Sequence, residues 1–192
     1  MSSGTGTALV VVDMQNVFIA PAGRLGVEGA DDVVQAVNAW VAHADAQGWP
    51  VFYTQDVGPI ELPSGDPDHS TDLHPSLDVR GTVVPKGPGK SAGFSGFVLA
   101  STAHIDGGGP GGGGLSTLDG LLREAEVDQL VVVGLAADVC VAATARDACR
   151  LGYQVSIPLP ATAFVHAHPR GDQAALDDLA SAGVVLTDQR QS

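Results

Sequence analysis

Residues 128–148 read DQLVVVGLAADVCVAATARDA, an apolar run that breaks at Gly134 and is followed by a series of small residues. The run Leu130–Val133 is typical of a strand buried on both faces, and the residues after Cys140 are typical of a helix. Cys140 therefore stands where a strand turns into a helix. Unpaired helix N–H groups at that point are expected to lower the pKa of its thiol below about 8.5. The alternative is a small buried hydrophobic residue.

The same alternation of short apolar runs with longer helical segments extends over the chain. Strands are expected at Ala8–Val12, Val51–Thr54, Thr82–Val84, Leu130–Val133, Gln154–Ile157 and Val184–Leu186. Helices are expected at Asp31–Gln47, Ser116–Glu126, Val141–Ala148 and Arg170–Ser181. This pattern predicts an α/β fold with a parallel sheet of about six strands. At 192 residues, the chain is expected to form one domain over residues 1–192.

Two segments depart from this pattern. Residues 59–74 are rich in Pro, Asp, Ser and Gly and are expected to form a long surface loop. Residues 106–114 read DGGGPGGGG, which is too rich in glycine for regular structure. We expect a flexible loop or lid there, with an ordinary tolerated insertion as the alternative.

The charge and the cysteines limit the partners and the compartment. A net charge of -13 disfavours nucleic acid and anionic membranes as partners. The N-terminus has no signal-peptide pattern, and no apolar run approaches the roughly 20 residues of a membrane span. Cys140 and Cys149 would lie about 13.5 Å apart along one helix, too far to pair. A reduced, cytoplasmic protein is therefore expected.

Three polar residues follow strands, where open parallel sheets bind their ligands. They are Asp13, Lys86 and Cys140. A cysteine nucleophile needs a base to take its proton and a cation or N–H donors to hold the negative charge. Asp13 and Lys86 can supply the base and the cation. Taken singly, Asp13 is also suited to a turn or helix cap, and Lys86 to a solvated surface charge.

The sequence resembles the isochorismatase-like cysteine hydrolases, and among them the nicotinamidase-like branch. The resemblance rests on VVVDMQNVF (10–18), on KG (86–87) with FSGF (94–97), and on GLAADVCV (134–141) with TARDA (144–148). It implies a Rossmann-like three-layer sandwich, in which helices cover both faces of the parallel sheet. It also implies a catalytic triad of Asp13, Lys86 and Cys140, and a cis peptide bond between Leu135 and Ala136.

The activity that the resemblance implies is hydrolysis of a small-molecule amide through a thioester. The N–H groups of Ala136 and Cys140 would form an oxyanion hole. Phe18 and Phe94 match aromatic positions of the family's substrate pocket, although both could instead be core residues. The resemblance also implies a homo-oligomer.

The resemblance is weaker at the metal site of the nicotinamidases. Those proteins bind a divalent metal through an Asp-x-His pair after the second strand, and the metal holds the pyridine nitrogen. This chain has Asp56 but places Gly58 where the histidine belongs. Of the downstream histidines, His69 is an uncertain ligand, and His74 resembles a family position that is not a ligand. We therefore expect no metal and no other cofactor.

The substrate stays open at this point, because Trp40 and Trp49 also do not replace the tryptophan of the nicotinamidase pocket. The first alternative is a metal-independent member of the superfamily that acts on a carbamoyl, ureido, lactam or isochorismate-type substrate. The second is a non-catalytic protein of the same fold that binds a small ligand or serves as a scaffold.

Two further classes have weaker support. Gly89-Lys90-Ser91 suggests a phosphate loop, but Val84 stands where that motif needs its first glycine. A cysteine–histidine hydrolase would need His166 or His168 as its base, and both are expected in a loop or at a helix cap.

Overall fold

A parallel β-sheet forms the centre of the computed structural model, which describes residues 6–19, 25–58, 66, 68–86, 94–97 and 117–191. The strand order is β3-β2-β1-β4-β5-β7, with the short β6 beside β4. The strands are β1 (Gly6–Val12), β2 (Val51–Asp56), β3 (Thr82–Lys86), β4 (Val127–Leu135), β5 (Gln154–Pro158), β6 (Thr162–Ala163) and β7 (Val185–Thr187). All pairings within this sheet are parallel. The expected parallel sheet is confirmed, and the two-residue β6 is an addition to the six expected strands.

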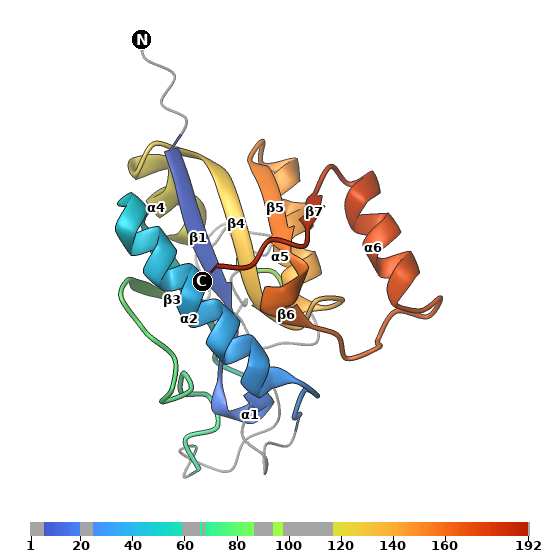
Figure 1. Cartoon of the computed structure of the whole chain (residues 1–192). Helices are drawn as coiled ribbons and strands as arrows, with labels where there is room; N and C mark the ends of the chain where they lie inside the picture. The colour runs from blue at the N-terminus through green and yellow to red at the C-terminus, as the bar shows by residue number, and fades with distance from the viewer. Residues whose placement is uncertain are drawn as a thin grey trace, which may run out of the picture.

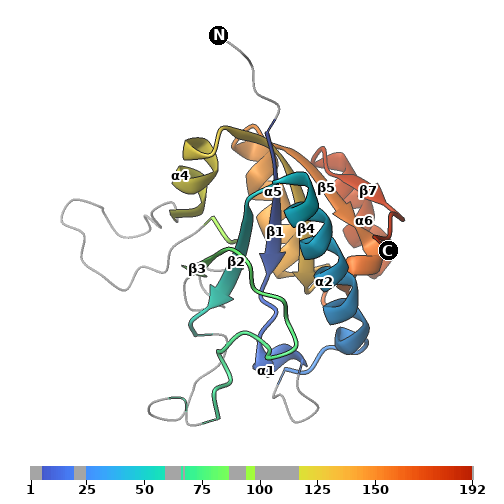
Figure 2. The same cartoon turned by 60° about the vertical axis from the view of Figure 1, so that its left-hand side comes forward.

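Helices cover both faces of the sheet, as Figures 1 and 2 show together. The helices are α1 (Asn16–Ile19), α2 (Ala30–Gln47), α4 (Thr117–Glu124), α5 (Cys140–Arg150) and α6 (Asp172–Ser181), with a 3₁₀ turn η1 (Leu159–Ala161). Buried residues of α2 pack on one face, and buried residues of α4, α5 and α6 pack on the other. The three-layer arrangement is therefore confirmed.

The central strand β1 shows why continuous apolar runs form this sheet. Leu9 and Val11 point toward the α2 layer, while Val10 and Val12 point toward the α4, α5 and α6 layer. All four are at most 1% exposed. A strand enclosed on both faces needs apolar residues at every position instead of at alternate ones.

Gly134 allows the two central strands to approach closely at their carboxyl ends. Gly134 of β4 is the register partner of Val12 of β1. Its φ is +108°, and a Cβ atom there would overlap the carbonyl oxygen of Val12. A residue without a side chain is required at this position.

Several boundaries differ from expectation by a few residues. Strand β3 continues through Pro85 to Lys86, which is possible because β3 is an edge strand and proline removes no essential ladder bond there. Helix α6 begins at Asp172 instead of Arg170, because Gly171 precedes it with φ +87°. Strand β7 begins one residue later than expected, at Val185.

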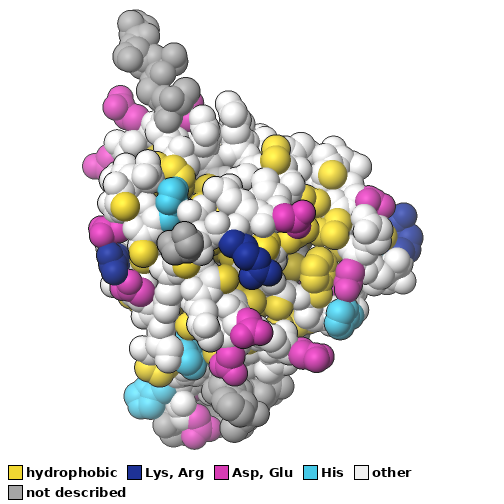
Figure 3. Space-filling view, in the orientation of Figure 1, with side chains coloured by type: hydrophobic (Ala, Val, Ile, Leu, Met, Phe, Trp, Pro, Cys, Tyr) yellow, Lys and Arg dark blue, Asp and Glu magenta, His cyan; other side chains and the backbone are white. Residues whose placement is uncertain are grey.

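The two segments expected to be loops are only partly described. Residues 106–114 lie outside the described residues, as do residues 59–65 and 67. In the described remainder, the Asp66 carboxylate accepts hydrogen bonds from the amides of Ser70 and Thr71, both at 3.0 Å. Acidic side chains are scattered over the described part of the face in Figure 3, with only isolated basic ones. Within the described ranges, none of the helices has the length and apolar character needed to cross a membrane.

Candidate active site

A fully buried ion pair lies at the carboxyl edge of the sheet. Lys86 Nζ is 2.7 Å from Asp13 Oδ2, and both side chains are 0% exposed. Lys86 Nζ also donates a hydrogen bond to the carbonyl oxygen of Phe94 at 2.7 Å. The Thr54 hydroxyl donates to Asp13 Oδ1 at 2.7 Å, so both carboxylate oxygens have a fixed partner. The alternative of Lys86 as a solvated surface charge is therefore wrong.

Local backbone geometry places the Asp13 carboxylate in this pair. Asp13 follows β1 directly and has φ +50°, a left-handed conformation that aspartate tolerates better than most residues. Its amide donates to both the carbonyl and the hydroxyl oxygen of Thr54, each at 3.2 Å. The pair is thereby anchored across β1 and β2.

Cys140 begins α5 beside this ion pair and is 7% exposed. Burial raises the pKa of its thiol above the ordinary value, and the nearby Asp13 carboxylate raises it further, while Lys86 opposes both effects. The expected lowering of this pKa by the helix N-terminus is therefore wrong for the resting site. Burial alone would lower the pKa of Lys86, but the negative charge of the Asp13 carboxylate raises it above the ordinary value. Both shifts favour a charged lysine and a protonated thiol in the resting site.

Backbone hydrogen bonds hold the turn before Cys140 in place. The peptide bond between Leu135 and Ala136 is cis, at the position that the resemblance implied. The carbonyl oxygen of Ala136 accepts hydrogen bonds from the amides of Val139 and Val141, both at 3.1 Å. The next amide, of Ala137, donates to the carbonyl of Ala163 in β6 at 2.8 Å.

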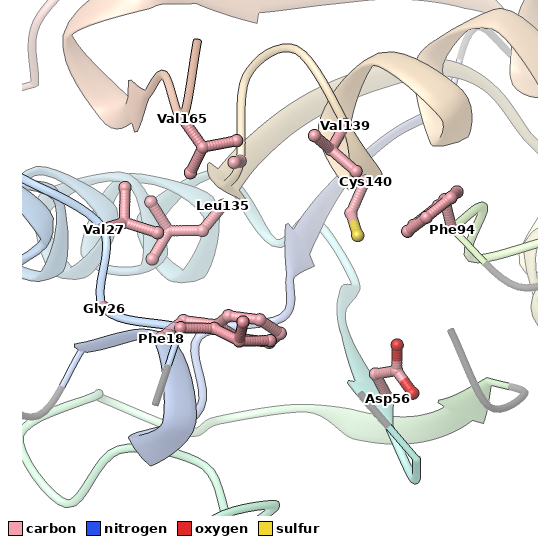
Figure 4. A pocket seen from close by; sticks show the side chains of 11 residues that line it. Phe18, Gly26, Val27, Asp56, Phe94, Leu135, Val139, Cys140 and Val165 are labelled. Atoms are coloured by element: carbon pink, nitrogen blue, oxygen red, sulfur yellow. The ribbon is translucent and has the colours of Figure 1, made fainter. Parts of the chain in front are cut away.

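A cavity of about 360 Å³ opens onto Cys140. It is lined by Phe18, Leu25, Gly26, Val27, Asp56, Phe94, Leu135, Ala136, Val139, Cys140 and Val165 (Figure 4). Phe94 is 41% exposed and is a wall of this cavity, so the core alternative is wrong for Phe94. Phe18 lines the cavity and also packs against the core beneath α2.

Sequence reasoning missed the residues that hold these groups in place. Gln15, which is 0% exposed, accepts a hydrogen bond from the Asp56 amide at 2.9 Å and donates to the Asp56 carbonyl at 2.8 Å. Asp138 accepts hydrogen bonds from the amides of Val165 at 3.0 Å and Ala167 at 2.6 Å. The only available signal was a polar glutamine inside the VVVDMQNVF motif.

Among the residues that the structure describes, the donor set near Asp56 does not fit a transition metal. Asp56 Oδ1 accepts the Gly58 amide at 2.9 Å, and Gly58 brings no side chain. His69 lies at the surface, where its Nδ1 is 3.0 Å from Asp72 Oδ2 and its side chain is 76% exposed. In the part of the chain that the structure describes, no three His, Cys, Asp or Glu side chains are grouped so that they could hold a metal ion. We derive no chemical step from a metal.

The histidines weighed as alternative bases form other contacts. His166 Nδ1 is 2.9 Å from Asp172 Oδ2, and this carboxylate raises the pKa of the exposed imidazole. His168 Nε2 is 3.1 Å from Asp178 Oδ2. Neither histidine is one of the described residues that line the cavity. Gly89-Lys90-Ser91 lies outside the described residues.

Comparison with known proteins identifies the class to which this fold and site belong. The family model described as "Isochorismatase domain" matches residues 7–191, so the chain belongs to the isochorismatase family. The nicotinamidase/pyrazinamidase of Mycobacterium tuberculosis is 34% identical over 198 residues, covering 93% of this chain and 97% of that protein. The ureidoacrylate amidohydrolase RutB of Pseudomonas syringae is 31% identical over 178 residues, covering 77% and 66%.

The same fold recurs in solved structures. PnC1 from L. infantum, in complex with nicotinate, superposes with a TM-score of 0.75 and 29% identity, covering 97% of this chain and 93% of that one. This likeness supports the nicotinamidase-like branch of the family.

Proposed function

We propose that the protein hydrolyses the C–N bond of a small-molecule amide. In this proposal Cys140 is the nucleophile, Asp13 is the base, and Lys86 is the positive charge that positions the Asp13 carboxylate and stabilises the Cys140 thiolate. The observation that carries this proposal is the fully buried Asp13–Lys86 pair beside a thiol that opens onto a cavity. The relatives named above, a nicotinamidase and an amidohydrolase, act on amides, which supports the same reaction class.

The first half of the reaction forms a thioester. Asp13 accepts the proton of Cys140 Sγ, and the thiolate attacks the amide carbonyl. The S–C bond forms while the carbonyl π electrons move to oxygen, where the amides of Ala136 and Cys140 donate hydrogen bonds to the new negative charge. Asp13 then passes its proton to the leaving nitrogen, and the C–N bond breaks.

The second half returns the site to its starting state. Asp13 takes a proton from water, and the resulting hydroxide attacks the thioester carbonyl. The S–C bond breaks, the acid product leaves, and the proton returns to Cys140. Lys86 stays charged throughout and stabilises each thiolate. The raised pKa of the resting thiol suits this scheme, because a protonated Cys140 supplies the proton that the leaving nitrogen needs.

The substrate has a second candidate class within the same chemistry. Gly58 in place of a metal-binding histidine, together with the similarity to a ureidoacrylate amidohydrolase, favours a metal-independent member that acts on a ureido, carbamoyl or lactam amide. The proposal further includes one catalytic domain, no cofactor, and a cytoplasmic homo-oligomer. The two cysteines, both free, suit a reducing compartment.

The test is an ammonia-release screen over nicotinamide, pyrazinamide, carbamoyl and ureido compounds. With any substrate found, Cys140→Ala is expected to lower turnover by at least about 10³-fold, because the nucleophile is lost. Cys149→Ala is the matched control, since Cys149 lies at the far end of the same helix. Undiminished turnover by Cys140→Ala would refute the mechanism. Failure to cleave any amide, with tight binding of one, would favour the non-catalytic alternative.

A further inference from the structure

Phe94 contributes to the site with both its side chain and its backbone. Its ring is part of the cavity wall, as Figure 4 shows. Its carbonyl oxygen accepts a hydrogen bond from Lys86 Nζ at 2.7 Å. The same ammonium lies 2.7 Å from Asp13 Oδ2, so the Phe94 carbonyl helps to orient the charge of the ion pair. A shift of Phe94 would therefore change the wall that a substrate contacts and the charge beside Cys140 together.

The segment that carries Phe94 is anchored by side chains. Residues 94–97 belong to neither a helix nor a strand. The Gly96 amide donates a hydrogen bond to Thr144 Oγ1 at 2.9 Å in a buried position. Phe97 is 1% exposed and stacks on Tyr153, with ring centroids 6.1 Å apart. The chain is thus fixed just after Phe94, both by a hydrogen bond and by packing.

Thr144 places this anchor on the helix that carries the thiol. It lies one helical turn after Cys140 in α5, where the two side chains share a face of the helix. Thr144 is 0% exposed, and a hydroxyl buried in this way needs a hydrogen-bond partner, which the Gly96 amide supplies. The position of α5 therefore sets the position of the Phe94 segment relative to the nucleophile.

Gly96 is also packed closely between two threonines. A Cβ atom at this position would lie 2.7 Å from Thr54 Cγ2 and 3.5 Å from Thr144 Cγ2. The Thr54 hydroxyl in turn donates to Asp13 Oδ1 at 2.7 Å. The backbone at Gly96 thus lies between the residue that holds the base and the residue that follows the nucleophile, which leaves little room for the segment to shift while its hydrogen bond to Thr144 is kept.

We propose that Thr144 is a positioning residue: through the Gly96 amide it holds the Phe94 carbonyl on the Lys86 ammonium and the Phe94 ring in the cavity wall. This inference rests on the proposed function and adds a residue to its machinery. Loss of the hydroxyl takes this acceptor from the Gly96 amide in a buried site, a loss large enough to displace an irregular segment. Displacement takes an acceptor from Lys86 and reshapes the wall, so both kcat and KM change.

Thr144→Val tests the role of the hydroxyl, because valine keeps the branched shape and removes the oxygen. With any amide that the protein cleaves, kcat/KM is expected to fall roughly 10- to 100-fold, through a lower kcat and a higher KM. Thr144→Ser keeps the hydroxyl and is expected to stay within about 3-fold of the wild type.

Tyr53→Phe is the matched control for loss of a buried hydroxyl. Tyr53 is 0% exposed, and its hydroxyl donates to the Asp78 carbonyl at 2.7 Å in the α2 layer, on the other face of the sheet from Thr144. Measured well below its melting temperature, this variant is expected to keep kcat/KM within about 3-fold of the wild type.

A spectroscopic readout of Lys86 does not depend on catalysis. The chain has two lysines, Lys86 and Lys90, so Lys90→Arg assigns the proton–nitrogen NMR signal of the Lys86 ammonium. In Thr144→Val this signal is expected to move, and its protons to exchange with solvent at least about 3-fold faster, because the Phe94 carbonyl no longer accepts from Nζ. Thr144→Ser and Tyr53→Phe are expected to leave the signal unchanged.

The inference is overturned if Thr144→Val keeps the wild-type Lys86 signal or the wild-type kcat/KM, if Thr144→Ser loses as much as Thr144→Val, or if Tyr53→Phe gives the same losses. If Thr144→Val does not fold, the wild-type protein decides. Its Gly96 amide is expected to exchange at least about 100-fold more slowly than an open peptide, and unprotected exchange would overturn the inference. If no amide is cleaved, or if Cys140→Ala keeps its turnover, the proposed function fails, while the Lys86 signal still tests the role of Thr144.

Discussion

Replacing Lys86 by methionine removes the positive partner of the buried ion pair and keeps a side chain of similar length. Nζ lies 2.7 Å from Asp13 Oδ2 with both side chains fully buried, so water cannot take over the role of the lost ammonium. At an effective dielectric constant near 20, the gross attraction across that distance is about 6 kcal/mol. Most of it offsets the cost of taking both charges out of water.

Removing one partner of such a pair lowers the free energy of unfolding by about 3–5 kcal/mol, because the other charge stays buried without compensation. For a chain of this size each kcal/mol corresponds to about 2–4 °C, so Lys86→Met is expected to lower the melting temperature by roughly 6–20 °C. Arg150→Met is the control, since Arg150 pairs with Asp147 while its own side chain is 76% exposed. That change is expected to cost less than about 1 kcal/mol.

The free energies of unfolding of Lys86→Met, Asp13→Asn and the double variant, measured in urea, complete a double-mutant cycle with the wild type. Asparagine tolerates the left-handed backbone at position 13, so Asp13→Asn removes charge with little strain. The double variant is expected to be more stable than the sum of the two single losses predicts, because neither charge is left unpaired. A loss below about 1 kcal/mol in Lys86→Met, or strict additivity in the cycle, would refute the reasoning.

Two further predictions concern pH and the cavity wall. Burial, and then the Asp13 carboxylate, raise the pKa of Cys140, so above about pH 9 the unfolded thiol ionises while the folded thiol stays protonated. The free energy of unfolding is therefore expected to fall between pH 8.5 and 10.5, by up to about 1.4 kcal/mol per pH unit from this group. Urea titrations should show a shallower fall in Cys140→Ser, and equal slopes would contradict the assignment. Asp138→Ala removes the acceptor for the Val165 and Ala167 amides and loosens the loop that carries Val165 into the cavity wall. With any confirmed substrate KM is expected to rise roughly 2- to 10-fold with a smaller change in kcat, and an unchanged KM would show that the loop keeps its place without Asp138.

The sheet could be predicted from sequence because its strands are buried on both faces. Runs such as Ala8–Val12 and Leu130–Val133 have apolar side chains at every position, which few other local structures require. Parallel strands also bring their carboxyl ends to one edge, so polar residues at the ends of separate strands were expected to meet. Asp13 and Lys86 do so.

The electrostatics and the supporting contacts could not be predicted in the same way. The helix N-terminus suggested a lowered pKa for Cys140, but burial and the neighbouring Asp13 carboxylate, which is remote only along the sequence, outweigh this local effect. Gln15 contacts Asp56, 41 positions further along the chain, so no local pattern reveals the pair. Strand β3 extends two residues beyond the expected end at Val84, because an edge strand tolerates Pro85.

Gly134 links the packing of the sheet to the reactivity of the site. Asp13 immediately follows Val12, and the turn that leads to Cys140 begins directly after Leu135, so the gap between β1 and β4 at Gly134 sets the separation of carboxylate and thiol. A methyl group would widen that gap, because it would overlap the Val12 carbonyl. The ability to react and the choice of substrate are thus encoded in different places. Substitutions in the cavity wall are expected to change the choice of substrate, whereas a substitution at Gly134, which has no chemistry of its own, is expected to impair the reaction itself.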